Sequence, residues 1–235
     1  MTATETGADS QAPPGLLTPG LTPIQRFKAI AGGSAGNLVE WYDWFAYSSF
    51  ALYFAPHFCP SGDPTSQLLQ AAAVFAIGFL ARPVGAWIRG LCADRAGRKA
   101  ALSLAVAMMC AGSLVIAVIP DYEVIGVAAP AILLLARLLQ GLSVGGEYGA
   151  SATYLSEMAG KERRGFWSSF QFVTLISGQL LALGILILLQ RILPTEALEA
   201  WGWRIPFLVS LLLLGVSLWI RLKLHESPTF QRMIA

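Results

Sequence analysis

Five charged side chains lie inside strongly apolar stretches of the sequence: Glu40, Asp43, Arg82, Arg137 and Glu147. If these stretches cross a bilayer, each charge near its centre costs roughly 2.5–3.5 kcal/mol on insertion scales, so five of them require a purpose. Glu40 and Asp43 are three residues apart and therefore share a helix face. Carboxylates suit proton uptake and release, because partial burial brings their titration toward the working pH. Arginine suits anion binding, because its planar fork matches a carboxylate and stays charged.

Two interpretations of these charges are possible. They form ion pairs that only hold helices together, or they line a polar cavity in which arginines bind an anion and carboxylates carry a proton. Buried ion pairs often contribute little net stability, so the pattern favours the cavity. At roughly 1.5 Å per residue, Glu40, Arg82 and Arg137 all lie about 15 Å deep in their stretches. We therefore predict Glu40 and Asp43 as proton-coupling residues, and Arg82 and Arg137 as substrate-binding residues.

Uncharged residues extend this predicted site. Tyr47 lies one turn beyond Asp43 on the same face and is predicted to bind substrate. A stripe of small and polar residues recurs at intervals of three or four: Ser168, Gln171, Thr174, Gly178 and Ala182. Such a stripe lines a watery cavity or lets another helix approach closely, and both readings fit equally well. We include Gln171 and Thr174 among the predicted substrate-binding residues. The glycines that follow Arg137 at every fourth position, Gly141, Gly145 and Gly149, predict a packing groove instead.

The elements that position these residues follow from composition. Of 235 residues, 55% are hydrophobic and only 13% are charged, whereas a soluble domain carries about 25% charged residues. Six stretches are long enough to span a bilayer, which takes about 20 apolar residues: 30–56, 68–88, 100–119, 127–157, 165–190 and 203–222. A soluble bundle would need polar outer faces, which stretches such as LVSLLLLGVSLWI lack. The sequence predicts an all-α membrane protein with six transmembrane helices.

The placement of basic residues predicts the orientation. Twelve of the sixteen lysines and arginines flank the same ends of these stretches, and such residues mark the cytosolic side. Both termini are therefore expected in the cytosol. We divide the chain into a disordered tail (1–27), a membrane domain (28–223) and the start of a cytosolic linker (224–235).

Other functional classes find little support in the sequence. The net charge is only +2, so no nucleic-acid partner is indicated. Two distant histidines and three scattered cysteines give no metal-like spacing, and no catalytic arrangement is recognisable. We expect no enzyme activity, no metal and no cofactor, with the proton as the coupling ion.

Sequence motifs then point to a family. The turn GLCADRAGRK resembles the cytosolic loop signature of the major facilitator superfamily, and the matching residues are Gly90, Asp94, Arg95, Gly97, Arg98 and Lys99. Longer stretches resemble the metabolite–proton symporter branch, and most of all its bacterial 2-oxoglutarate (α-ketoglutarate) permeases: GNLVEWYDWFAYSSF, FLARPVGAW, RLLQGLSVGGEYGASATYLSE, SSFQFVTLISGQLLAL and WGWRIPF.

This resemblance implies a fold and an activity. The fold would be one half of a twelve-helix bundle, built as a 3+3 inverted repeat. The activity would be proton-coupled import of a small organic anion across the bacterial inner membrane. The substrate implied is 2-oxoglutarate, with citrate, another dicarboxylate, shikimate or an osmolyte as alternatives. The signature residues would form a cytosolic charge cluster with Glu147 that holds the outward-open state.

The resemblance also raises the question of the second half. The family has about twelve spans and this chain has six predicted ones. Part of the cavity wall is therefore expected to come from another six-helix half. The chain is expected to be a truncated product, one of two separately encoded halves, or a dimer. Its expected partners are the anion, the lipid bilayer, and a carboxy-terminal half or a second copy. A non-transporting remnant or a six-helix scaffold is the alternative reading.

Overall fold

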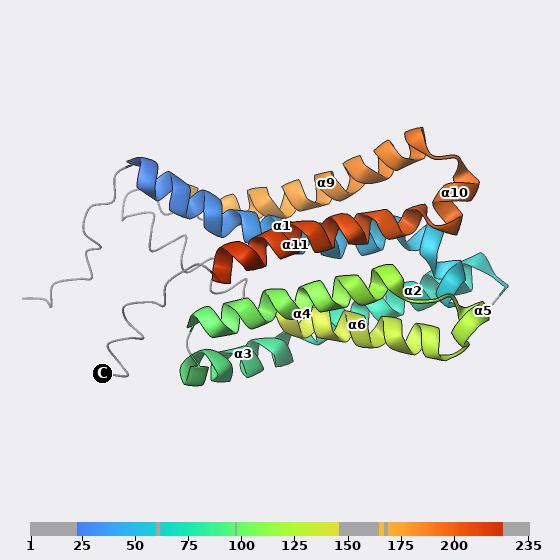
Figure 1. Cartoon of the computed structure of the whole chain (residues 1–235), viewed down its shortest axis with the longest axis horizontal. Coiled ribbons are helices and arrows are strands. Elements are labelled where there is room, and N and C mark those ends of the chain that lie inside the picture. Colours follow the sequence, from blue (N-terminus) through green and yellow to red (C-terminus); the bar gives the residue numbers. More distant parts are fainter. Residues whose placement is uncertain (1–22, 60–61, 97, 146–164, 167–168, 223–235) are drawn as a thin grey trace, which may run out of the picture.

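The computed structural model describes residues 23–59, 62–96, 98–145, 165–166 and 169–222 (Figure 1). Within these ranges, side chains are described outside 23–35, 93–94, 96, 98–102 and 220–222. Of the predicted cytosolic charge cluster, the signature residue Gly97 and the added Glu147 lie outside the described residues. Asp94, Arg98 and Lys99 lie in helices, but their side chains are among those not described.

The described part of the chain is all helical. Its elements are α1 (Pro23–Phe58), α2 (Pro64–Leu80), α3 (Arg82–Ala96), α4 (Arg98–Val118), α5 (Tyr122–Ile125), α6 (Ala128–Val144), α9 (Phe170–Ile192), α10 (Thr195–Ala200), the 3-10 turn η1 (Gly202–Arg204) and α11 (Ile205–Leu222). The second predicted stretch is divided at Ala81 into α2 and α3. Asp63 caps α2 by accepting from the backbone N–H groups of Thr65 and Ser66, which satisfies donors that a helix start leaves free.

The helices pack lengthwise as a bundle (Figure 1). Helix α1 contacts α9, α11 and α2, while α6 contacts α2, α3 and α4. Helix α2 belongs to both sets, and the contact between α4 and α11 joins them a second time. The short elements α5 and α10 gather at one end of the bundle (Figure 1).

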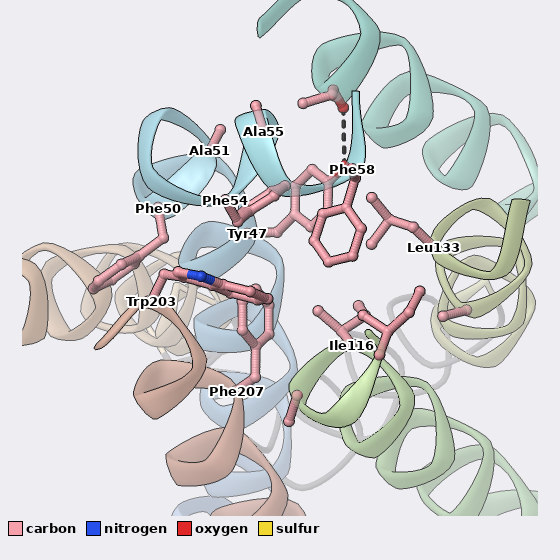
Figure 2. Close-up of a cluster of buried hydrophobic side chains, with 14 of the residues drawn as sticks. Tyr47, Phe50, Ala51, Phe54, Ala55, Phe58, Ile116, Leu133, Trp203 and Phe207 are labelled. Atoms are coloured by element: carbon pink, nitrogen blue, oxygen red, sulfur yellow. Dashed lines mark hydrogen bonds between the residues drawn. The ribbon is translucent and has the colours of Figure 1, made fainter. Parts of the chain in front are cut away.

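An aromatic core fills the bundle near the end formed by α5 and α10. Figure 2 shows side chains from α1 meeting others from η1, α11, α4 and α6. Phe54 and Trp203 lie at its centre, with ring centroids 6.0 Å apart. Burying aromatic side chains of this size supplies a large share of core stability. The carboxy-terminal half of α1 is therefore part of this core.

The outside of the bundle is apolar. Leu80, Trp87 and Leu212 are 73%, 69% and 68% exposed. Among the described residues, three helical segments are long and apolar enough to cross a membrane: Pro64–Cys92, Phe170–Ile192 and Gly202–Trp219. Ser103–Val118 and Ala128–Val144 are apolar but shorter. The exposed apolar side chains match a lipid environment, so the described part of the chain is a helical membrane domain.

The packing groove predicted on the fourth stretch is confirmed for two of its three glycines. A Cβ on Gly141 would collide with the carbonyl of Gly78, and one on Gly145 would collide with the carbonyl of Arg82. These contacts bring α6 against α2 and α3 at backbone distance, as small residues do in membrane helices. Gly149 lies outside the described residues.

Candidate anion and proton site

Asp43 lies at the centre of a buried polar network that joins four helices. Its Oδ1 accepts hydrogen bonds of 2.5 Å from Ser113 on α4 and 2.5 Å from Ser210 on α11. Its Oδ2 accepts from Gln140 Nε2 on α6 at 2.8 Å, and Arg137 Nη1 lies 3.9 Å from the same oxygen. The side chains of Asp43 and Arg137 are fully buried. The network supplies an ionised carboxylate with donors and a counter-charge, which burial requires.

Arg137 is anchored on one side only. Its Nη1 donates to Gln140 Oε1 at 2.7 Å, and its guanidinium lies over the rings of Trp44 and Tyr47, at 4.0 and 4.3 Å from their centroids. Its buried Nε and Nη2 have no hydrogen-bond partner within the described part of the chain. The Nε–H and Nη2–H groups point the same way along one edge of the guanidinium, and such an edge binds a carboxylate through two parallel hydrogen bonds.

Arg82 repeats this arrangement from the α2–α3 junction. Its guanidinium lies 4.2 Å from the Trp44 ring centroid and 4.1 Å from that of Phe79. Its Nε and Nη2 are also buried, and no described residue pairs with them. Both arginines therefore stack on the same tryptophan, and each keeps its carboxylate-binding edge unused. Glu40, only 4% exposed, is close enough to Arg82 to interact with it electrostatically.

Tyr47 connects this group to a small hollow. Its hydroxyl donates to the Ala71 carbonyl at 3.0 Å, and its ring covers Arg137. A hollow of about 160 Å³ lies against Tyr47 and Phe75 and is lined also by Ser48, Ala51, Leu68, Ala71 and Ala72. Phe75 lies 5.4 Å from the Arg137 guanidinium. The aromatic cover of Arg137 is thus one wall of an open space.

Gln171 and Thr174 lie elsewhere, in the contact between α9 and α1. Asn37 Nδ2 donates to Thr174 Oγ1 at 2.6 Å, and Gln171 Nε2 donates to Asn37 Oδ1 at 3.2 Å. On the same stripe, a Cβ at Gly178 would lie 2.8 Å from the Leu38 carbonyl. Close helix approach is therefore observed along this stripe, and substrate binding by Gln171 and Thr174 stays a prediction.

The loop signature is described only in part. Gly90 and Arg95 are exposed on α3, and the other signature side chains lie outside the described ones. Within the described residues, no group of three or more histidine, cysteine or acidic side chains is arranged to hold a metal ion.

Several residues of this site cannot be found by looking for charged residues in apolar stretches. Trp44, Gln140, Ser113 and Ser210 are uncharged, and Ser113 and Ser210 come from distant helices. Two sequence signals pointed to the first two: Trp44 is next to Asp43, and Gln140 lies three residues after Arg137 on one helix face. Asn37 carried a similar signal, because it is a polar residue one turn before Trp41 in an apolar stretch.

Comparison with known proteins gives consistent results. The sequence model of the family "Sugar (and other) transporter" matches residues 29–235. The chain is 59% identical over 203 residues to the alpha-ketoglutarate permease of Escherichia coli K12. The matched region covers 86% of this chain and 47% of the permease. It is 39% identical over 213 residues to the citrate-proton symporter of Salmonella typhi, covering 91% of this chain and 49% of the symporter.

Relatives with other named substrates also match. The proline/betaine transporter of Salmonella typhimurium is 37% identical over 207 residues, covering 88% of this chain and 41% of the transporter. Among solved structures, a partially occluded inward open conformation of the Escherichia coli xylose transporter XylE matches with a TM-score of 0.75 at 21% identity, covering 89% of this chain and 52% of XylE. The fold is therefore that of about half of XylE, and the chain spans about half the length of the curated relatives that it matches.

Proposed function

Because the chain belongs to the sugar (and other) transporter family, whose members are transporters and not enzymes, we propose that it forms one half of a proton-coupled importer for a small organic anion. The proposed membrane domain is 28–223, with six spans in a 3+3 inverted repeat and both termini in the cytosol. A tail at 1–27 and a linker beginning at 224 flank it. The partner that completes the cavity is a carboxy-terminal half or a second copy of this chain.

The observation that carries the proposal is the pair of arginines on one tryptophan, Arg137 buried and Arg82 half-buried. Arg82 and Arg137 each keep an unused carboxylate-binding edge within the described residues. Two cations this close repel each other, and aromatic rings offset that repulsion only in part. An anion with carboxylate groups would satisfy the unused donors, and it would balance the two cations once Asp43 and Glu40 are protonated. We propose 2-oxoglutarate as this anion, supported by the 59% identity to a permease named for it.

The network around Asp43 supports a mechanism for coupling. Arg137 faces Asp43 with its Nη1. Its unused edge, formed by Nε and Nη2, would face the substrate. When Asp43 takes up a proton, Arg137 loses its counter-charge and binds the substrate carboxylate more strongly. The hydroxyls of Ser113 and Ser210 can accept as well as donate, so they can still pair with the protonated acid. Proton and anion would then enter together, with little net buried charge. Glu40 is the second proposed proton site, through Arg82.

A scaffold or non-transporting remnant is the competing function, and one observation favours it. The bonds to Asp43 join α1 to α4, α6 and α11, so they hold helices together whether or not a proton moves. The two proposals differ in what the charge of Asp43 affects: coupling for the importer, and folding alone for the scaffold.

Uptake of labelled 2-oxoglutarate tests the proposal. Cells that lack their own carrier would express this chain alone, or with the carboxy-terminal half of a related permease, with and without an imposed proton gradient. Gradient-driven uptake with the added half supports the half-transporter, and uptake by the chain alone supports a dimer. No uptake in either arm, with the chain in the membrane, supports the scaffold. Excess citrate, shikimate or betaine as competitor identifies the substrate class.

A further inference from the structure

A second polar cluster lies at the carboxy-terminal end of α1, apart from the arginine site. His57 Nδ1 is 3.0 Å from Asp121 Oδ2, and His57 Nε2 is 2.7 Å from the backbone oxygen of Glu199. Asp121 precedes α5, and Glu199 lies in α10. One imidazole ring thus contacts two connecting segments that are far apart in the sequence.

Both atoms that face the ring are hydrogen-bond acceptors. The backbone oxygen of Glu199 cannot donate. Asp121 accepts a charge-assisted hydrogen bond from Arg204 Nη2 on its other oxygen at 2.9 Å, so both of its oxygens act as acceptors. A neutral imidazole carries one N–H, so one of its nitrogens would turn a lone pair toward an acceptor. Only the imidazolium satisfies both contacts.

The surroundings of the ring fit a cation. The Trp203 ring centroid is 5.5 Å from that of His57 and 4.3 Å from Arg204 Cζ. Arg204 also donates to the carbonyls of Ala117 and Ile119, at 3.1 and 2.9 Å. The two basic groups therefore lie on either side of Asp121. The short elements α5 and α10 carry three acidic side chains, Glu123, Glu196 and Glu199. Helix α9, which packs against α1 and α10, carries the basic Arg191 in its last turn.

We propose that His57 is a proton-binding site separate from Asp43, and that its proton fastens the end of α1 to the segments that carry Asp121 and Glu199. Loss of this proton removes one of the two donors and leaves a lone pair against an oxygen. The end of the bundle formed by α5 and α10 would then open more readily as the pH rises. In the proposed orientation this end faces the outside of the cell. The inference does not depend on transport or on the identity of the substrate.

Nitrogen NMR of the purified chain in nanodiscs tests the assignment directly. The sequence holds only two histidines, so ¹⁵N-histidine labelling with a His225→Gln variant isolates the His57 signals. We expect both ring nitrogens to be protonated at pH 7. In Asp121→Asn, where the counter-charge is lost, the proton should be released at about tenfold higher proton concentration, that is, at lower pH.

The matched control is Glu123→Gln, which removes a neighbouring exposed carboxylate and should leave the titration unchanged. A neutral His57 ring at pH 7 in the unsubstituted chain would overturn the proposal. So would an unchanged titration in Asp121→Asn. If that variant fails to fold, the protonation state in the unsubstituted chain decides alone.

Discussion

At the scale of single residues, the site combines one satisfied acid with two incompletely satisfied bases. Asp43 has partners for both oxygens, whereas Arg82 and Arg137 each keep two buried nitrogens without a partner among the described residues. Leaving buried donors unpaired costs about 1–3 kcal/mol for each group. Such a cost is usual at a site that waits for a ligand and unusual at one built only for stability.

The first prediction at this scale concerns Asp43. Asp43→Asn keeps the size of the side chain and its hydrogen bonds to the serines, but it removes the charge that titrates. The proposed importer should still take up substrate, and its uptake should rise less when a proton gradient is imposed, because only the Glu40 site would still bind a proton. The measurement is the ratio of uptake with and without the gradient. Asp63→Asn is the control, because Asp63 is exposed and asparagine also caps a helix. Unchanged coupling in Asp43→Asn would refute the role of Asp43.

The second prediction concerns Arg137. Arg137→Lys keeps a positive charge but loses the flat edge with two parallel donors. One lost hydrogen bond to a charged group costs about 1.5–3 kcal/mol, so the affinity for 2-oxoglutarate should fall roughly 10- to 100-fold. Equilibrium binding to the purified assembly measures it. Arg191→Lys is the control, because Arg191 is exposed on α9. Equal affinities in the two variants would argue against a bidentate contact.

At the scale of elements, glycine decides how closely the helices approach. Gly141 lies against the backbone of α2, while Gly184 on α9 has open space around its Cβ position. Gly141→Ala should therefore force α6 away from α2 and destabilise the chain by about 1–3 kcal/mol. Gly184→Ala makes the same chemical change and should be neutral or slightly stabilising. Thermal unfolding in detergent compares them, and equal melting temperatures would contradict the packing described here.

At the scale of the whole molecule, the proposed orientation places the end of the bundle formed by α5 and α10 outside the cell. Gly62 lies before α2, near the end formed by α5 and α10, and Gly90 lies on α3 toward the other end; both are exposed with open space around them. In intact cells, a membrane-impermeant thiol reagent should label Gly62→Cys and should reach Gly90→Cys only after permeabilisation. The reverse pattern would invert the proposed orientation. Labelling of both in intact cells would contradict the predicted crossings between them.

The sequence by itself determined the class of the protein and the positions of the charges. Apolar stretches of this length can satisfy their backbone groups in lipid only as helices, so the helical membrane fold was predictable from local composition. The functional importance of Asp43 and Arg137 was also predictable from their own stretches, because a charge buried in lipid is costly in any arrangement. The glycine groove was predictable because its residues recur on one helix face.

The tertiary structure decided which residues meet. Asp43 binds serines from α4 and α11, and both arginines stack on Trp44; neither contact leaves a periodic signal in one segment. Gln171 and Thr174 fit a cavity and a helix contact equally well by sequence, and only the structure shows that they contact Asn37 on α1. Likewise, His57 and Asp121 are far apart in sequence, and only the arrangement of helix ends places two acceptors on one imidazole. Such pairings depend on how helices are set against each other, which no single helix encodes.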